Sequence, residues 1–247
     1  IYRCKGGNQQ LATKLRDAIG ASRIILGLPV SSVEVRDNRA VVTCRDRRTI
    51  EADDVVLATP PTVWHKIEFT PALPADLKPQ MGNALKYLAA VKSRFWEAAE
   101  LAPYAFTDGM VSETWDGTDL QLEGDGACLV SFSGGPAADE CRKFNKVAER
   151  DAAYARELEV AYPGYGENFV RSMFMDWQAD MWALCGYSFP APGQITTIGP
   201  RLRKGLGRLH FAGEHCCYGF VGYMEGALNS GVTLAKRLAI RDGVLKA

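Results

Sequence analysis

The chain has 247 residues, of which 47% are hydrophobic and 23% charged, a composition typical of one or two globular domains and not of a fibre or a disordered tail. Its 29 lysines and arginines balance 29 aspartates and glutamates, so no basic surface for nucleic acid is expected. No apolar run reaches the roughly 18 residues of a membrane helix, and no secretory signal is visible. Seven cysteines without a Cys-x-x-Cys pair, and three histidines, favour reduced thiols in a cytoplasmic protein without a metal site.

The N-terminal part of the chain predicts one helix followed by short strands. Residues 8–19 keep apolar side chains on one helical face, with Asn8 as the cap and Gly20 as the stop. Residues 30–35 and 40–44 are two apolar runs separated by a turn, which predicts an antiparallel meander. The chain begins with Ile1 rather than Met, which indicates a processed product or one part of a longer reading frame.

Further strands are expected along the next hundred residues. Residues 54–58 form a short apolar strand that stops at Thr59-Pro60-Pro61, a pattern typical of the edge of a cofactor-binding α/β unit. Residues 85–96 are an extended mixed run, and strands are also plausible over 104–111 and 127–132.

The segment from residue 146 to residue 189 predicts a helix and then a group of aromatic residues. Residues 146–162 predict a helix with an apolar stripe at Ala152, Ala155, Leu158 and Val160. The following segment is rich in small residues and carries four large aromatic residues, Trp177, Trp182, Tyr187 and Phe189. Such crowding usually marks a packed core.

The C-terminal segment predicts a strand, a glycine-containing loop and a helix. The strand covers 209–212 and is followed by Gly213, while Gly222 precedes a helix over 223–240. The apolar residues expected on one face of this helix are Met224, Ala227, Leu228, Gly231, Val232, Ala235 and Leu238. A helix N-terminus next to glycines suits an anionic group, such as a phosphate or the edge of a reduced flavin.

Two strings near the C-terminus, Phe211-Ala212-Gly213-Glu214-His215 and Gly222-Tyr223-Met224-Glu225-Gly226-Ala227, closely resemble the FAD signature of flavin-dependent amine oxidases. This is the family of monoamine oxidases, polyamine oxidases and L-amino acid oxidases. Further motifs agree in order and spacing over nearly the whole chain. They are Gly6-Gly7-Asn8, Leu28-Pro29-Val30, Ala58-Thr59-Pro60-Pro61 and Phe69-Thr70-Pro71-Ala72-Leu73-Pro74.

The resemblance implies a mixed α+β and α/β fold with two parts. An incomplete, Rossmann-like FAD-binding part would comprise residues 1–70 and 191–247. A substrate-binding domain, with a mixed β-sheet flanked by helices, would comprise residues 71–190. The residues implied to contact the flavin are Val30, Pro60, Trp177, Gly213, Glu214, Gly222, Tyr223 and Met224.

The resemblance also implies catalytic and substrate-binding residues. Lys86 aligns with a lysine that holds a water near flavin N5, and a lowered pKa in a partly buried position would suit that role. Tyr187 and Tyr223 align with two aromatic residues that flank the substrate amine before the flavin. Trp115 and Phe132 fall where the family lines its substrate cavity, with plain core packing as the alternative.

The chain departs from the family pattern at two points. Some monoamine oxidases attach FAD through a cysteine directly before the first tyrosine, but here that position is Gly186 and Cys185 stands one residue earlier. Because a shift of one residue turns a strand side chain to the opposite face, we expect non-covalent FAD. The Gly-x-Gly-x-x-Gly unit is absent from this chain. We therefore expect a partner chain that carries it and a hetero-oligomer.

The implied reaction is the oxidation of an amine or L-amino acid to an imine, with oxygen reduced to hydrogen peroxide and the imine then hydrolysed to a carbonyl compound and ammonia. The protein would mainly orient, while the flavin does the chemistry. Two alternatives stay open at this point. One is a flavin-dependent dehydrogenase or desaturase of the same superfamily, and the other is a non-catalytic scaffold subunit that retains the fold.

Overall fold

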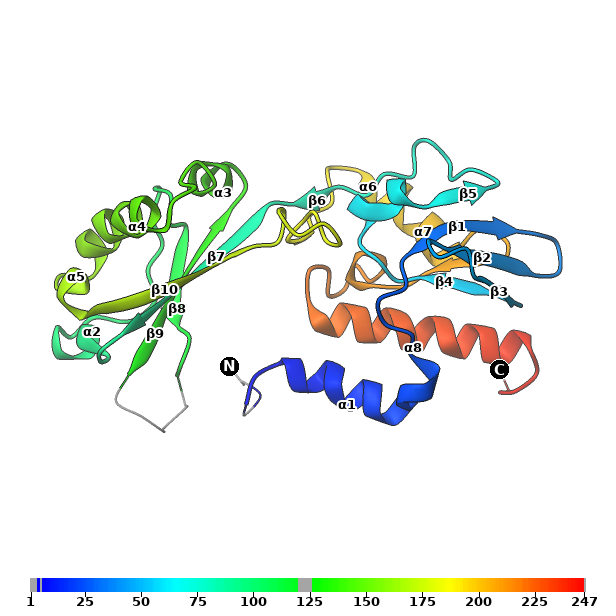
Figure 1. Cartoon of the computed structure of the whole chain (residues 1–247), viewed down its shortest axis with the longest axis horizontal. Coiled ribbons are helices and arrows are strands. Elements are labelled where there is room, and N and C mark those ends of the chain that lie inside the picture. The colour runs from blue at the N-terminus through cyan, green and yellow to red at the C-terminus, as the bar shows by residue number, and fades with distance from the viewer. Residues whose placement is uncertain (1–3, 5, 120–125, 247) are drawn as a thin grey trace.

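The computed structural model has two lobes joined by a narrow junction (Figure 1). It describes residue 4, residues 6–119 and residues 126–246. We call residues 84–176 the central lobe, and residues 9–77 together with 194–246 the terminal lobe. At the junction, β6 (Met81–Gly82) pairs antiparallel with β11 (Tyr187–Ser188).

The central lobe is built on an antiparallel four-stranded sheet. Its strands in spatial order are β10 (Phe169–Asp176), β7 (Ala84–Val91), β9 (Ala127–Gly134) and β8 (Glu113–Asp116). Its helices are α2 (Phe95–Ala98), α3 (Pro136–Cys141), α4 (Val147–Ala161) and α5 (Tyr165–Asn168). Strands β7, β9 and β10 and all four helices contribute side chains to one buried hydrophobic cluster.

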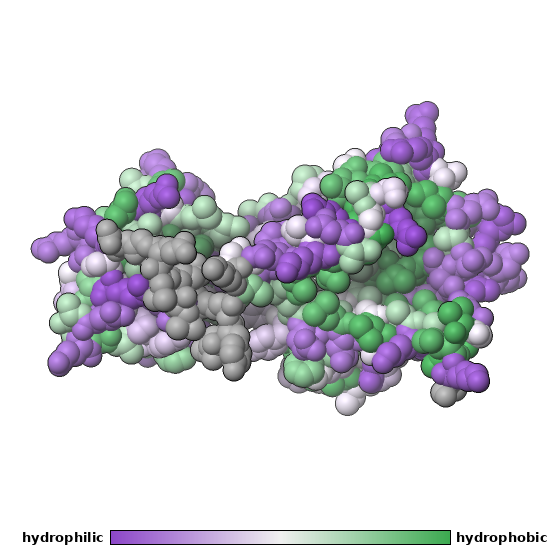
Figure 2. Space-filling model, turned by 90° about the horizontal axis from the view of Figure 1, so that it is seen from below, coloured by the Kyte–Doolittle hydropathy of each residue, from purple (hydrophilic) through white to green (hydrophobic). Residues whose placement is uncertain are grey.

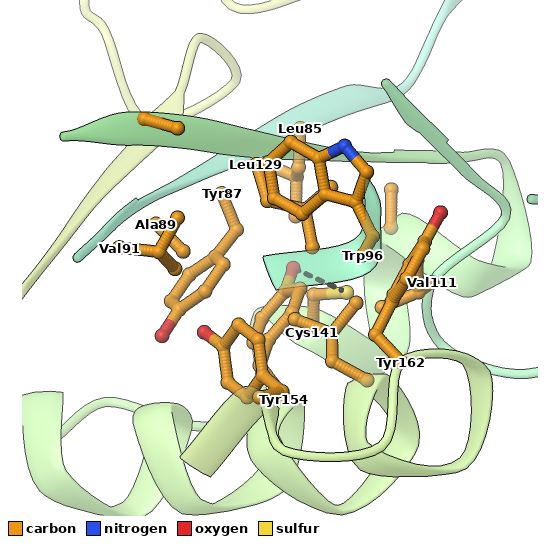
Figure 3. Close-up of a cluster of buried hydrophobic side chains, with 14 residues drawn as sticks. Leu85, Tyr87, Ala89, Val91, Trp96, Val111, Leu129, Cys141, Tyr154 and Tyr162 are labelled. Atoms are coloured by element: carbon orange, nitrogen blue, oxygen red, sulfur yellow. Dashed lines mark hydrogen bonds between the residues drawn. The ribbon is translucent and has the colours of Figure 1, made fainter. Parts of the chain in front are cut away.

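Strand β7 shows how this cluster leaves one face of the sheet open. Leu85, Tyr87 and Val91 are at most 2% exposed, and Tyr87 stacks on Tyr154 of α4 with ring centroids 3.9 Å apart. These side chains belong to the cluster drawn in Figure 3. Lys86 lies between them in sequence and is exposed. Because successive strand residues point to opposite faces, Lys86 stands on the face away from the helices.

The terminal lobe contains two smaller sheets. The first has four strands in the order β3 (Thr49–Ala52), β2 (Ala40–Cys44), β1 (Val30–Val35) and β5 (Glu68–Thr70). The second pairs β4 (Val55–Leu57) with β12 (Leu209–Phe211) in parallel. Its α-helices are α1 (Gln9–Ile19), α6 (Gln194–Thr197), α7 (Gly199–Lys204) and α8 (Met224–Arg241). Its short 3-10 helices are η1 (Ala21–Arg23), η2 (Pro61–Lys66) and η3 (Glu214–Cys216).

Several sequence-based expectations for this lobe are confirmed. The meander is present as β1, β2 and β3 in antiparallel order. Helix α1 begins at Gln9 and ends before Gly20, whose positive φ of 91° favours glycine. Asn8 precedes the helix but makes no side-chain cap hydrogen bond, so its predicted capping role is wrong. Helix α8 also starts and ends within one residue of the expected bounds.

The apolar stripes expected on two helices are only partly buried. Helix α4 buries Ala153, Tyr154 and Leu158, whereas Val160 is 85% exposed because the sheet lies on the other side of the helix. Helix α8 buries Gly226, Ser230 and Leu234, at spacings of four residues. Its expected apolar face is largely exposed instead, with Met224 at 49% and Val232 at 54%.

Two further expectations are wrong in the middle of the chain. Residues 104–111 form no strand beyond a single bridge at Phe106, because the Thr107 N–H donates to the Ser112 carbonyl and closes a turn. The aromatic group at 177–189 is not core. Trp177, Trp182 and Phe189 are 47%, 46% and 62% exposed. Within the described residues, no helix has the length and apolar character needed to cross a membrane.

Candidate functional site

The parallel pair β4 and β12 fixes where the candidate site begins. Leu57 lies opposite Phe211 at the ends of the two strands. The Ala212 N–H donates to the Leu57 carbonyl at 3.2 Å, which joins the two segments as they leave the sheet. Ligands of open α/β sheets bind at the carboxyl ends of the strands. The segments carrying Pro60 and Gly213 therefore start at the edge where a ligand is expected.

Glu214 fastens the junction strand to the loop that precedes α8. Its carboxylate accepts hydrogen bonds from the Ser188 N–H at 2.9 Å, from the Ser188 hydroxyl and from the Gly222 N–H at 2.6 Å. Charge-assisted hydrogen bonds of this kind are among the strong ones. The carboxylate thereby holds Tyr187 and Tyr223, the neighbours of its two partners, in one place.

The two glycines of this region fit closely against protein groups. A Cβ on Gly213 would overlap the ring of buried His215, and the Gly213 N–H donates to the Ser230 hydroxyl at 2.9 Å. That N–H is thus already used within the protein. Gly222 has φ +81°, and a Cβ there would lie 3.3 Å from Cδ2 of Tyr187. Larger residues at these positions would push the loop away.

Side chains from four strands form a continuous row on the open side of the molecule. The Lys86 ammonium lies 5.7 Å from the centre of the Trp115 ring. Trp115 and Phe132 have ring centroids 6.4 Å apart, and Phe132 stacks on Tyr187 at 6.5 Å with an interplanar angle of 21°. The structure therefore brings together four of the residues expected at the catalytic and substrate-binding positions.

Tyr223 completes this row from the start of α8. Its side chain is 70% exposed, and a Cβ on Gly222, the residue before it, would contact the Tyr187 ring. The pKa of Tyr187 is raised, first because the phenol is partly buried and then because Tyr223 and Glu113 are close to it. Both tyrosines thus lie in one electrostatic environment, although 36 positions of sequence separate them.

The N-terminus of α8 offers unoccupied donors beside the tyrosines. Tyr223 is the N-cap residue of this 18-residue helix, and it provides no side-chain cap hydrogen bond. Among the described residues the Met224 and Glu225 N–H groups have no acceptor, whereas the Gly226 N–H donates to the Tyr223 carbonyl at 3.0 Å. A helix N-terminus attracts negative charge, so these groups fit the polar edge of a flavin.

Val30 and the segment before Pro60 lie beside strand β4. Val30 opens β1 and lines a cavity of about 320 Å³ together with Thr59 and Trp182. Pro60 follows Thr59 and is the N-cap of η2. The walls of this cavity are mostly apolar, as a planar ring system requires. These residues also fit the cofactor that the sequence resemblance implies.

The remaining residues of the predicted site are more loosely placed. Trp177 lies in the turn after β10, and among the described residues its ring makes none of the contacts that join Trp115, Phe132 and Tyr187. A Cβ on Gly186 would overlap the Cβ of Ala84 and lie 3.0 Å from its backbone nitrogen. No side chain therefore fits at position 186.

Sequence reasoning missed two residues of this region. Ser188 ties the junction strand to Glu214 over 26 positions, a distance at which the sequence gives no signal. Glu113 lies on the open face of β8, two residues before Trp115. The alternation of a strand could have identified Glu113, because residues two apart point to the same side.

Comparisons with known proteins support a common family. The pattern of the family described as "Flavin containing amine oxidoreductase" matches residues 1–239. Amine oxidase [flavin-containing] B of Homo sapiens is 28% identical over 252 residues, covering 94% of this chain and 46% of the relative. The probable flavin-containing monoamine oxidase A of Dictyostelium discoideum is 26% identical over 250 residues, covering 97% and 53%.

Solved structures agree with these relatives. A putrescine oxidase triple mutant superposes with a TM-score of 0.87 at 26% identity, covering 96% of this chain and 53% of that chain. Cyclohexylamine oxidase from Brevibacterium oxydans IH-35A superposes with a TM-score of 0.86 at 28% identity, covering 95% and 53%. The expected mixed fold of sheets and helices is thereby confirmed. This chain spans about half the length of the proteins it matches.

Proposed function

This chain belongs to the flavin-containing amine oxidoreductase family, and we propose that it is the C-terminal part of an FAD-dependent oxidase of amines or L-amino acids. The single observation that carries the proposal is the row from Lys86 through Trp115 and Phe132 to Tyr187, which meets the N-terminus of α8 at Tyr223. A lysine, an aromatic slot and a helix N-terminus converge there from separate elements. A plain packing role would not require an exposed lysine and an exposed tyrosine.

The chain's own residues orient the reactants. Tyr187 and Tyr223 form the two sides of a slot that admits a narrow amine and holds its α-carbon in place. The Lys86 ammonium holds a water beside the slot and presents a positive charge where oxygen is reduced. When bound, FAD supplies the redox chemistry that converts the amine and oxygen to an imine and hydrogen peroxide. Water then hydrolyses the imine to a carbonyl compound and ammonia.

Attachment of the cofactor is proposed to be non-covalent. Position 186 would have to carry the linking cysteine, and the approach of Ala84 leaves no room for a Cβ there. Cys185 is 5% exposed, and its thiol lies 3.5 Å from the Thr62 hydroxyl. Burial raises the pKa of the Cys185 thiol, which disfavours the reactive thiolate.

Completion of the flavin site is proposed to require sequence outside this chain. The chain spans about half of its relatives, and the Gly-x-Gly-x-x-Gly unit is not among its residues. Helix α1 and the exposed face of α8 present Leu15, Ile19 and Val232 at 45%, 50% and 54% exposure. A segment or partner chain that carries the dinucleotide-binding unit would cover them, which makes a cytoplasmic hetero-oligomer the expected assembly.

Replacement of Lys86 tests the oxidase function. In the flavin-loaded protein, Lys86→Met should slow flavin reoxidation by oxygen at least about tenfold, because the cation that assists oxygen is lost. The FAD content and the rate of flavin reduction by amine should stay close to wild type. Lys143→Met is the matched control, since Lys143 follows α3 on the covered side of the same lobe.

Stopped-flow spectroscopy of the reduced flavin mixed with oxygenated buffer measures this rate. Reoxidation of Lys86→Met at the wild-type rate would remove the lysine from the oxidase mechanism. It would also favour an acceptor other than oxygen.

A further inference from the structure

A row of direct cross-strand neighbours crosses the open face of the central sheet. Glu113 of β8 lies opposite Phe132 of β9, which lies opposite Lys86 of β7. On its other side, Glu113 forms an isolated antiparallel bridge with Phe106. Direct cross-strand neighbours have their Cβ atoms about 4.5–5.5 Å apart and share one face. Glu113 is therefore flanked by a phenylalanine on either side.

Two more rings complete the surroundings of Glu113. Trp115, two residues further along β8, stands on the same face and packs 6.4 Å from Phe132. Tyr187, which belongs to the junction strand β11, stacks on Phe132 with ring centroids 6.5 Å apart. The carboxylate thus lies within an aromatic surface that borders the tyrosine slot.

The negative charge of Glu113 has no direct cationic partner. Within the described parts of the chain, Glu113 makes no ion pair and no side-chain hydrogen bond. The nearest positive side chain of the row, Lys86, lies beyond Phe132 and places its ammonium over the Trp115 ring instead. A half-buried carboxylate without a cation attracts one, and aromatic faces add to the attraction.

The charge of Glu113 also reaches the slot itself. Together with burial and Tyr223, it contributes to the raised pKa of the Tyr187 phenol. Because Phe132 lies opposite Glu113 and stacks on Tyr187, the carboxylate borders the space between the tyrosines.

We propose that Glu113 binds a second ammonium group on the substrate, so that this site prefers diamines to monoamines and disfavours substrates with a distal carboxylate. The inference rests on the proposed oxidase function and names its substrate class. The reacting amine would lie between Tyr187 and Tyr223, while the distal ammonium would lie against Glu113 and the rings of Phe106 and Trp115. Glu113 then sets specificity because its carboxylate attracts a distal ammonium and repels a distal carboxylate.

Three amines of similar length that differ in the charge of the far end test this assignment. They are cadaverine, n-hexylamine and 5-aminopentanoate, which end in an ammonium, a methyl group and a carboxylate. The measurement is kcat/KM for reduction of the flavin in the complete flavin-loaded protein under anaerobic conditions. The wild type should prefer cadaverine to n-hexylamine by about tenfold or more, with 5-aminopentanoate last.

The variant Glu113→Gln keeps the shape of the side chain and removes its charge. It should lower the cadaverine to n-hexylamine ratio by roughly five- to tenfold through KM, while kcat/KM for n-hexylamine changes less than about twofold. Glu113→Lys should move the preference to 5-aminopentanoate. Glu68→Gln is the matched control, because Glu68 is exposed on β5 of the other lobe.

The possible failures are distinguishable. If n-hexylamine and cadaverine reduce the flavin equally well, and Glu113→Gln leaves that ratio unchanged, the assignment of Glu113 is overturned and the oxidase function stands. If none of the three amines, nor any other amine or L-amino acid, reduces the flavin, the oxidase function is overturned and the assignment with it.

Discussion

In the central lobe, α4 lays Tyr154 and Leu158 against the sheet with 0% and 1% exposure. In the terminal lobe, none of the residues of α1 is buried. Leu26, just after α1, is 84% exposed. Figure 2 shows hydrophobic side chains across the part of the molecule where the terminal lobe lies, around a hollowed surface. The two lobes therefore differ in how much apolar surface they leave exposed.

The central lobe closes its core from local sequence, since the strands and helices between residues 84 and 176 supply all members of its buried cluster. The terminal lobe draws its core from both ends of the chain, with Leu57 and Trp64 packed beside Leu209 and Phe211. Its parallel sheet has only β4 and β12 among the described residues. Parallel sheets are normally covered on both faces, so the proposed dinucleotide-binding segment would pack against this lobe.

The largest expected effect concerns the stability of the two lobes. Leu158→Ala should lower the free energy of unfolding by about 2–5 kcal/mol, because it opens a cavity in the closed core. Leu15→Ala on α1 should change it by less than about 0.5 kcal/mol in this chain alone, because Leu15 is 45% exposed. Urea unfolding of both variants measures the difference. Equal losses would mean that α1 is already packed, and the contrast between the lobes would fail.

A second prediction concerns the pH dependence of the terminal lobe. Burial lowers the pKa of His215 from 6.5 to about 4, and its Nε2 has no hydrogen-bond partner among the described residues. Between pH 6.5 and pH 4 the unfolded state therefore binds a proton that the folded state does not. The contribution of neutral His215 to the free energy of unfolding is complete above pH 6.5 and is lost as the pH falls to 4. The loss should be about 3 kcal/mol.

Replacing the histidine should flatten this dependence. His215→Leu removes the titrating group, so its stability should fall less than that of the wild type between pH 6.5 and pH 4. His65→Leu, at an exposed position of η2, is the matched control. Chemical unfolding at a series of pH values is the measurement. An unchanged slope in His215→Leu would show that other groups carry the acid sensitivity.

The third prediction concerns the surface where the lobes meet. Tyr187→Leu or Tyr223→Leu should lower kcat/KM for amine about tenfold or more, which corresponds to about 1.4 kcal/mol of transition-state stabilisation. FAD content and melting temperature should stay near wild type, most clearly for Tyr223, which is 70% exposed. A depressed melting temperature with unchanged kcat/KM would assign both rings to packing and not to the substrate slot.

Local patterns predicted the positions of elements better than their buried faces. Strands β7 and β9 and helices α1, α4 and α8 were expected from periodicity and glycine stops. The buried face of α4 was predicted only in part, because Leu158 is buried as expected but the neighbouring sheet selects Tyr154 over Val160. Periodicity alone does not contain that choice.

The candidate site was predictable only as far as its motifs. The residues from Lys86 to Tyr223 were expected from family resemblance, and their meeting depends on pairings between strands far apart in sequence. Glu214 was expected to touch the cofactor, but the structure engages its carboxylate with Ser188 and Gly222. Such a hydrogen bond over 26 positions leaves no trace in local sequence. Glu113 could have been identified from the sequence, because it lies two residues before Trp115 on the same strand and so shares its face.

The measurement that tests the account most directly is the flavin spectrum of the chain produced together with the missing dinucleotide-binding segment. We predict a yellow complex whose oxidised flavin absorbance is bleached by an amine or L-amino acid under anaerobic conditions and returns with oxygen, releasing hydrogen peroxide. The chain produced alone should bind FAD weakly. A colourless complex, or a flavin that neither an amine nor an L-amino acid bleaches, would contradict the assignment of this chain to an amine oxidase site.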